Sequence, residues 1–345
     1  MKVQFINIPQ VNQAVLTEKE LDETLKPSEV IVKAHYAVTS AGTDTARYSG
    51  MDGNNFPQET GAMTVGEIIA KGAEVNDYKV GDRVACLTPN ASHVKCDTLP
   101  RPGFGWNGHR VTARVPDSVS LCEATIAYPY YVSMAAVRES GVALGEETLV
   151  VGGGMIGNTC AQLFQCAGAS VLLADLSEKR LATAQACGIR HVVQPGKGGV
   201  TLAEAVQKWT QGRPLAQVVF AIEGGAKLLA DVIPLLGHRG NIVLHGGYRQ
   251  SENIDAHMFA QMQGRCQRII TTQAWGYFVA EDPVHFHHQT VLGHFRQVMQ
   301  LIAEKRVNPQ PLISMVRPKD CQQVFQDLIH NKDKYIAAVY DWTSR

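Results

Sequence analysis

Hydrophobic positions follow a short-range pattern in the first third of the chain. Runs rich in β-branched residues at 29–34 and 66–70 alternate with turn residues, and Gly81-Asp82 forms a turn that leads into another such run. These patterns predict short strands. Residues 88–108 contain three prolines and three glycines and are expected to form a loop. Many short strands without long helices predict a small, irregular β-barrel.

The pattern changes in the middle of the chain, where wholly apolar runs alternate with segments of helical periodicity. The apolar runs cover residues 148–151, 170–174, 191–193, 217–222 and 241–245. Helical segments are expected at 156–167 and 178–187, and an earlier one over 118–137 contains Pro129. Strands that are apolar on both faces and alternate with helices are typical of a doubly wound parallel sheet.

The last part of the chain combines a helix with a terminal strand. A helix is expected over 289–305, and the apolar run at 335–340 is expected to be a strand that returns to the first domain. A chain of 345 residues is expected to hold two domains. We place the first domain at residues 1–122 and 276–345 and the second at 123–275.

Composition narrows the classes of partner. Lys plus Arg and Asp plus Glu are 32 each, so the chain lacks the net positive charge typical of nucleic-acid binding. No apolar run approaches the ~18 residues of a membrane span, and the N-terminus lacks the apolar segment of a signal peptide. The eight cysteines form no C-x-x-C pair and are expected to be reduced thiols. We therefore expect a cytoplasmic protein with a small-molecule substrate and neither a nucleic-acid nor a membrane partner.

A glycine-rich sequence lies between the first apolar strand of the second domain and the helix that follows it. Gly152, Gly154 and Gly157 satisfy G-x-G-x-x-G. The first glycine allows a tight turn, the second lets the backbone approach a pyrophosphate, and the third allows close helix–strand packing. Met155 and Ile156 open the helix, whose free N–H groups and dipole favour phosphate. The sequence therefore predicts a dinucleotide site.

An acidic residue defines which dinucleotide is preferred. Asp175 ends the next apolar strand, about 20 residues after the loop, where a carboxylate accepts hydrogen bonds from ribose hydroxyls. Because a 2′-phosphate would meet like charge there, NAD(H) is favoured over NADP(H). Arg180 follows five positions later and would soften that preference.

Three segments of the first domain accompany the glycine loop as recognisable motifs: A-G-T-D at 41–44, G-A-M-T-V-G-E at 61–67 and V-G-D-R-V at 80–84. With these motifs the chain resembles, over most of its length, the medium-chain dehydrogenase/reductase superfamily. The resemblance implies an α/β fold in which a GroES-like β-barrel catalytic domain accompanies a doubly wound Rossmann domain. It also implies an oxidoreductase acting on CH–OH groups that assembles as a homodimer or homotetramer.

The chain departs from zinc-containing members of that family at the metal site. The family's ligand positions hold Ala41, Ala62, Met63 and Tyr128 here. Alanine and methionine cannot supply the thiolate, imidazole or carboxylate that zinc requires. The loop with four closely spaced cysteines that holds the family's structural zinc is also missing. The comparison with the family therefore implies a zinc-free member.

A second group of possible metal ligands lies near the start of the last long helix. It comprises His285, His287, His288 and His294. Their spacing matches no standard closed metal site, so a polar helix start is the expected interpretation. The role of the cluster stays open.

Without zinc, a side chain must take the hydroxyl proton or donate to the developing oxyanion. Thr43 occupies the position of the family's hydroxyl relay. Asp44 either takes part in proton transfer or holds the turn through backbone hydrogen bonds. Tyr128 replaces a metal ligand and is expected to point into the cleft as a donor or acid. Weaker candidates are Tyr130, Tyr131, His93 and His109.

The remaining site residues complete the expected cofactor and substrate contacts. Ile222 and Gly246 follow strand ends on the cofactor side, and the turn at 223–225 resembles the family's nucleotide-side loop. Ala274 lies in a segment that resembles the one whose backbone meets the nicotinamide carboxamide. The expected substrate pocket consists of His93, Trp106, Tyr131 and Trp275.

Three functions remain open from the sequence. The first is an NAD-dependent, zinc-independent enzyme that interconverts a secondary alcohol and a ketone on a sugar, glycoside or cyclitol-like substrate. The second is an NADPH-dependent reductase of activated double bonds, as in quinone and enoyl reductases, against which Asp175 counts. The third is a protein that binds the cofactor without turnover.

Overall fold

The computed structural model describes residues 1–344 except 54, 100–111, 223, 248–251, 278 and 280–289. The chain divides into two compact units. Unit 1 comprises Met1–Tyr128, Trp275–Lys305 and Leu312–Arg345, and unit 2 comprises Pro129–Ala274 and Arg306–Pro311. The border thus falls after Tyr128, later than the sequence-based position after residue 122.

The short segment Arg306–Pro311 was assigned from the sequence to the first domain, but it packs with the second unit. The Gln162 side chain explains this, because its Oε1 accepts a hydrogen bond of 2.7 Å from the backbone N–H of Asn308. Asn308 in turn donates through Nδ2 to the carbonyl of Ala186 at 3.1 Å. These contacts tie the segment to two helices of unit 2.

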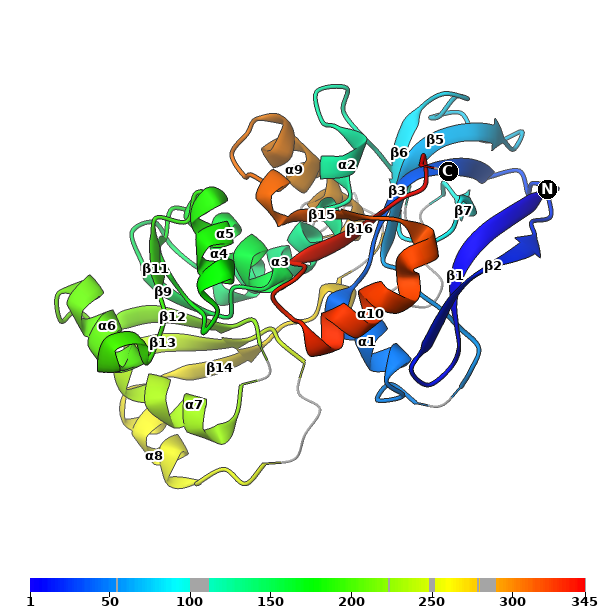
Figure 1. Ribbon diagram of the computed structural model, residues 1–345. Helices are drawn as coiled ribbons and strands as arrows, with labels where there is room; N and C mark the ends of the chain where they lie inside the picture. Colours follow the sequence, from blue (N-terminus) through cyan, green and yellow to red (C-terminus); the bar gives the residue numbers. More distant parts are fainter. Residues whose placement is uncertain are drawn as a thin grey trace. The chain divides into compact units, whose positions relative to one another are not determined.

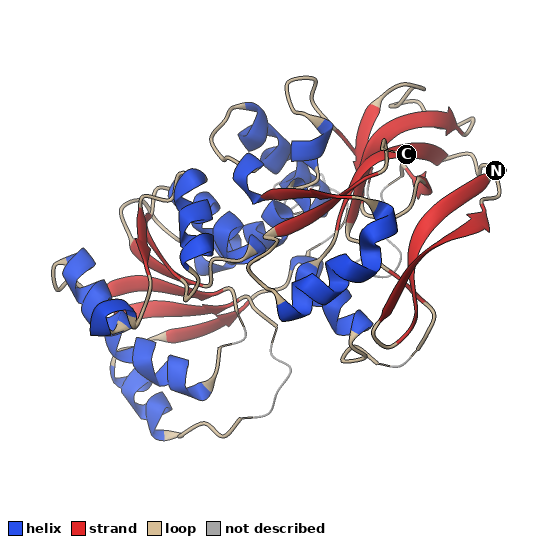
Figure 2. Ribbon diagram, viewed as in Figure 1, coloured by secondary structure: helices blue, strands red, loops and turns tan. Residues whose placement is uncertain are grey.

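Unit 2 is a doubly wound α/β domain (Figures 1 and 2). Within the described residues its sheet has the order β11-β10-β9-β12-β13-β14, and the pairings are parallel. Its strands are β9 (Glu147–Val151), β10 (Ser170–Ala174), β11 (His191–Val193), β12 (Leu215–Phe220), β13 (Leu236–Leu244) and β14 (Arg268–Thr271). Its helices are α3 (Ala127–Ser140, which begins in unit 1), α4 (Met155–Cys166), α5 (Glu178–Ala186), α6 (Leu202–Thr210), α7 (Ala226–Val232) and α8 (His257–Gly264). Pro129 lies in the first turn of α3, where a missing N–H costs no hydrogen bond.

Alternate residues of the apolar strands pack against different helices. Val150 and Val219 point to the face covered by α3, α4 and α5, whereas Leu149 and Val218 point to the face covered by α6, α7 and α8. Figure 2 shows helices on both sides of this sheet. Burial of each such aliphatic side chain contributes about 1.5–3 kcal/mol to folding. The chain reverses its winding between β9 and β12, and ligands bind at the carboxyl ends of strands beside such a switch.

Unit 1 is built on strands, as expected for the first domain, and their pairings are antiparallel except that β15 and β16 pair in parallel. One sheet has the order β2-β1-β4, and the other runs β15-β16-β3-β5-β6-β8 with β7 paired to β3. The strands are β1 (Lys2–Gln10), β2 (Gln13–Glu20), β3 (Glu29–Val38), β4 (Gln58–Glu59), β5 (Met63–Lys71), β6 (Arg83–Cys86), β7 (His93–Asp97), β8 (Thr112–Arg114), β15 (Ile313–Val316) and β16 (Ala337–Asp341). The helices are α1 (Ala41–Tyr48), α2 (Leu121–Ala124), α9 (Val291–Ala303) and α10 (Cys321–His330).

Two expectations for unit 1 have different outcomes. The terminal strand is confirmed, because Val339 and Tyr340 of β16 pair antiparallel with Val38 and Ala37 of β3. The expectation of a loop over 88–108 is wrong for residues 93–97, where β7 pairs with β3, and its residues 100–108 lie outside the described part of the chain. The strand exists because Val94 and Cys96 alternate with polar residues and enter the hydrophobic core beside β3.

Two further sequence-based expectations concern the whole chain. All eight cysteines are free thiols, as expected. In the part of the chain that the structure describes, no helix is both long enough and apolar enough to cross a membrane.

Candidate functional site

The glycine turn of unit 2 has a backbone that larger residues would disrupt. Gly152 has a φ of +105°, which favours glycine. A Cβ on Gly157 would lie 1.7 Å from the carbonyl oxygen of Gly152, so α4 approaches the turn as closely as its backbone allows. Gly154 is the N-cap of α4 and supplies no side-chain cap, which leaves the first N–H groups of the helix available to a ligand. Met155 is buried, and Ile156 is half-buried.

Asp175 connects this turn to the end of β10. Its Oδ2 accepts a hydrogen bond of 2.6 Å from the Gly153 N–H, and its Oδ1 accepts one of 2.7 Å from the Ser177 N–H. A carboxylate offers about four acceptor positions, so two remain for other donors. Nη1 of Arg180 lies 3.8 Å from Oδ2 of Asp175, and the two side chains form an ion pair. The carboxylate is therefore held in place and partly neutralised.

A cavity of about 820 Å³ opens beside Asp175 within unit 2. This volume lies in the range of small-molecule and cofactor sites. Its wall includes Gly152, Asp175 and Arg180 together with apolar residues. Leu176, Val200 and Ile222 are 76%, 43% and 37% exposed and line it. Apolar side chains exposed around a cavity fit a flat aromatic group such as a nucleobase.

On the other side of the winding switch, the ends of β12 and β13 are in close contact. A Cβ on Gly246 would lie 2.1 Å from the carbonyl oxygen of Ile222, so glycine is required there. Ala274 is buried, and its carbonyl accepts a hydrogen bond of 3.1 Å from the Tyr131 hydroxyl. Tyr131 is itself fully buried. This contact connects Tyr131 of α3 to Ala274 at the end of unit 2.

In unit 1, Asp44 lies fully buried on α1 and joins two segments of the chain. Its Oδ2 accepts hydrogen bonds from the backbone N–H of Ser40 at 2.9 Å and of Gly61 at 3.1 Å. Nη1 of Arg47 lies 3.4 Å from Oδ1. Burial raises the pKa of Asp44 to about 6, although the arginine and the two N–H groups act in the opposite direction. The geometry favours the structural role of Asp44, in which it holds residues 61–63 against α1.

Tyr128 lies in the same region of unit 1 as Asp44. Burial raises its pKa to about 12, and a hydrogen bond from the Ser40 hydroxyl acts against that shift. The phenol therefore keeps its proton at neutral pH. Ser40 is the N-cap of α1, yet its side chain makes no capping bond. Sequence reasoning missed Ser40 and Arg47, and the only local signal was their position beside the 41–44 motif. Thr43 lies half-buried in the first turn of α1.

The residues at the family's zinc positions do not fit a zinc ion. Ala41, Ala62 and Met63 offer no thiolate, imidazole or carboxylate, and the phenol of Tyr128 is held protonated. Over the described ranges, no three His, Cys, Asp or Glu side chains gather in a group suited to a metal ion. The donor set thus disagrees with the zinc chemistry of other family members.

The other candidates occupy varied positions. His93 is half-buried on β7, 3.2 Å from the Ser92 hydroxyl, and burial lowers its pKa. Tyr130 is fully buried, and its hydroxyl donates to Oε1 of Gln162 at 2.8 Å, as in a core contact. Trp275 is half-buried. His294 is buried on α9, and its ring packs edge-on against the ring of Tyr277 with 4.8 Å between the ring centroids. Trp106, His109, Glu223, His285, His287 and His288 lie outside the described residues.

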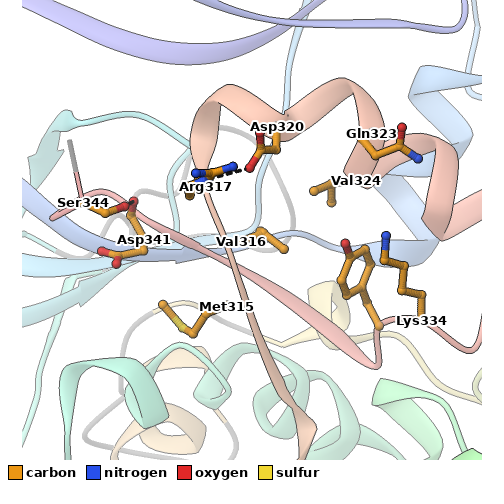
Figure 3. Close-up of a pocket in the computed structure, with 10 residues that line it drawn as sticks. Met315, Val316, Arg317, Asp320, Gln323, Val324, Lys334, Asp341 and Ser344 are labelled. Atoms are coloured by element: carbon orange, nitrogen blue, oxygen red, sulfur yellow. Dashed lines mark hydrogen bonds and ion pairs between the residues drawn. The ribbon is translucent and has the colours of Figure 1, made fainter.

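A second cavity, of about 560 Å³, lies in unit 1 beside β15, β16 and α10 (Figure 3). Figure 3 shows the Arg317 side chain directed at Asp320, and the two form an ion pair of 2.7 Å. Lys334 at the other side is paired with Asp327 at 2.6 Å. The described residues that line this second cavity include none of the expected site residues, so we assign the cavity no part in the chemistry.

Comparison with known proteins agrees with this architecture. Residues 26–121 match the family model described as an alcohol dehydrogenase GroES-like domain, and residues 156–280 match the one described as a zinc-binding dehydrogenase. The chain belongs to the medium-chain dehydrogenase/reductase superfamily. The expected fold class is confirmed, as is the expectation of an oxidoreductase acting on CH–OH groups.

Several similar proteins act on sugars or their derivatives. The 2-dehydro-3-deoxy-L-galactonate 5-dehydrogenase of Pseudoalteromonas atlantica is 27% identical over 80% of this chain and 81% of its own length. The putative D-xylulose reductase of Agrobacterium fabrum is 26% identical over 91% of this chain and 89% of its own. The crystal structure of galactitol-1-phosphate dehydrogenase from Escherichia coli superposes with a TM-score of 0.81 at 17% identity, covering 98% of this chain and 99% of that one.

Proposed function

We propose that this protein is an NAD-dependent oxidoreductase that interconverts a secondary alcohol and a ketone on a sugar, glycoside or cyclitol-like substrate without zinc. The observation that carries the proposal is the carboxylate of Asp175, which borders the 820 Å³ cavity at the end of β10. We also propose that it acts in the cytoplasm, in keeping with its eight free cysteines, and that it forms a homodimer or homotetramer, as its family resemblance implies.

The cofactor preference follows from charge. The residues present fit a dinucleotide, because the glycine turn leaves free N–H groups at α4 and the cavity has both an acidic and an apolar wall. Two acceptor positions on Asp175 can receive ribose hydroxyls, whereas a 2′-phosphate would be repelled. Arg180 reduces that repulsion, since it is paired with Asp175. We therefore expect a preference for NAD over NADP that is real but moderate.

Zinc independence follows from the donor set in unit 1. The bound nicotinamide would accept or supply the hydride, and the chain must handle the proton. Tyr128 keeps its proton at neutral pH and suits hydrogen-bond donation to a carbonyl oxygen. The Ser40 hydroxyl hydrogen-bonds to that phenol and can orient it. We propose that Tyr128 supports the developing oxyanion in place of the metal.

The substrate class rests on the relatives that act on sugar acids, pentuloses and hexitol phosphates. It is tested by incubating chelator-dialysed protein with NAD+ and a panel of aldoses, glycosides and cyclitols while NADH formation is recorded. We expect turnover of at least one member of the panel without added metal. Full loss of activity on dialysis, with recovery on adding zinc, would show that zinc independence is wrong.

The cofactor assignment has its own matched pair of variants. Asp175→Ala is expected to weaken NADH binding and to reduce discrimination against NADPH. Asp231→Ala removes another acidic side chain at the same cavity, one that is paired with Lys227, and should leave that discrimination unchanged. If both variants behave alike, Asp175 does not set the preference. A tenfold preference of the wild type for NADPH, about 1.4 kcal/mol, would favour a reductase of activated double bonds.

A further inference from the structure

A half-buried histidine, His245, lies at the carboxyl end of β13 in unit 2, and the proposed chemistry does not use it. Nδ1 of His245 is 2.5 Å from the hydroxyl oxygen of Thr272, which follows β14. Nε2, the other ring nitrogen, is shielded from solvent and has no hydrogen-bond partner among the described residues. A buried polar atom without a partner is costly, so its retention calls for an explanation.

The position of His245 in the sheet suggests which ligand could supply the missing hydrogen-bond partner of Nε2. Asp175 and its cavity lie at the β9-β10 half of the sheet, and His245 and Thr272 end the strands of the β13-β14 half. A dinucleotide lies across the winding switch that separates the two halves. Gly246, next to His245, packs on Ile222, which lines the cavity. With the adenosine at Asp175, the nicotinamide end is directed to the strand ends near His245.

The charge of the His245 imidazole determines which chemical group of the dinucleotide it is suited to bind. Burial lowers its pKa to about 4, so the imidazole is neutral at physiological pH. A neutral ring suits an uncharged polar group better than a pyrophosphate, and it does not repel the positive pyridinium of an oxidised cofactor. The Thr272 hydroxyl can donate to or accept from Nδ1, so Nε2 is free to be either acceptor or donor. A carboxamide meets both cases because it has N–H donors and a C=O acceptor.

We propose that the Nε2 atom of His245, oriented by Thr272, hydrogen-bonds the carboxamide of the nicotinamide ring and selects for the nicotinamide end of the cofactor. This inference rests on the proposed function, since it assumes that the dinucleotide binds unit 2. His245 is therefore a binding residue, and Thr272 is a positioning residue.

The test compares two probes that differ in the nicotinamide. NADH and ADP-ribose share the adenosine diphosphate ribose part, and only NADH has the carboxamide. Titration of the full-length wild type, His245→Leu and His245→Gln with both probes gives the dissociation constants. We expect His245→Leu to raise the dissociation constant of NADH by about fivefold to tenfold, which is the effect of losing one buried hydrogen bond. The dissociation constant of ADP-ribose should stay within about twofold of the wild-type value. His245→Gln, which keeps an amide donor and acceptor, should recover part of the NADH affinity.

Two controls separate this inference from a structural effect. His191→Leu changes a histidine at the start of β11, at the opposite edge of the same sheet, and should affect neither probe. Thr272→Val should weaken the binding of NADH by about twofold to fivefold and leave the binding of ADP-ribose unchanged. Equal weakening of NADH and ADP-ribose in His245→Leu, or no change in NADH, would overturn the inference. Failure of the wild type to bind either probe would instead overturn the proposed function.

Discussion

The buried carboxylate of Asp44 offers a quantitative test of how α1 is held in unit 1. Asp44→Ala removes the acceptor of two backbone N–H groups, those of Ser40 and Gly61, and the partner of Arg47. A buried donor left without an acceptor costs about 1–3 kcal/mol, so the two N–H groups together cost about 2–6 kcal/mol. Part of this is offset, because the variant no longer buries a carboxylate.

The raised pKa of Asp44 gives the size of that offset and its pH dependence. A pKa of about 6 in the folded state, against 3.8 for the ordinary group, means that the folded chain binds the proton more tightly than the unfolded chain. The free energy of unfolding therefore falls as pH rises from about 4 to about 6, by about 3 kcal/mol in total, and is flat above. Asp44→Ala abolishes this dependence.

The two contributions predict a destabilisation that depends on pH. We expect Asp44→Ala to lower the free energy of unfolding by about 1 kcal/mol at about pH 7.5, where the offset applies in full, and by about 1.4 kcal/mol more at about pH 5. Urea unfolding at the two pH values measures this difference. Hydrogen exchange of peptides covering α1 and residues 60–63 should show faster exchange in the variant.

A matched control isolates the buried contacts from the charge of Arg47. Asp52 is exposed and also pairs with Arg47, at 3.6 Å, so Asp52→Ala should change the free energy of unfolding by less than about 0.5 kcal/mol. Asp44→Asn should lose the pH dependence and retain part of the stability, because its amide oxygen still accepts an N–H. The reasoning is refuted if Asp44→Ala behaves like Asp52→Ala, or if its effect is the same at both pH values.

Three further variants test other parts of the account. In Gly157→Ala, the new methyl would lie 1.7 Å from a backbone oxygen of the turn, so NADH titration should show binding more than tenfold weaker, whereas Gly264→Ala, in open space, should bind normally. Tyr131→Phe leaves the buried carbonyl of Ala274 without its donor and should cost about 1 kcal/mol in urea unfolding; an unchanged midpoint would contradict the contact. Tyr128→Phe should lower kcat at least about tenfold with little change in KM or unfolding midpoint, and steady-state rates equal to wild type would remove Tyr128 from the mechanism.

The sequence predicted unit 2 more closely than unit 1 for a physical reason. Strands buried on both faces are continuous apolar runs, so β9 and β10 were recognised to within a residue. The strand β7 was missed because prolines and glycines surround it and only Val94 and Cys96 are buried in it. Short, half-buried strands have too few apolar positions to stand out from a loop.

The candidate site shows the same limit. Sequence context was sufficient for the glycine turn and Asp175, whose spacing is local. It left the role of Asp44 open, because the Gly61 N–H that it accepts from belongs to a distant segment. It did not reveal the hydrogen bond from the Tyr131 hydroxyl to the carbonyl of Ala274. Contacts between residues far apart in the chain depend on the tertiary fold, which residue types alone do not specify.

The central claim is that unit 2 holds NAD(H) with its ribose at Asp175. Fluorescence titration of the chelator-dialysed wild-type protein with NADH and with NADPH tests it most directly. The account predicts that NADH binds severalfold more tightly than NADPH, and that the discrimination falls in Asp175→Ala. Equal or tighter binding of NADPH by the wild type, or no binding of either nucleotide, would contradict it.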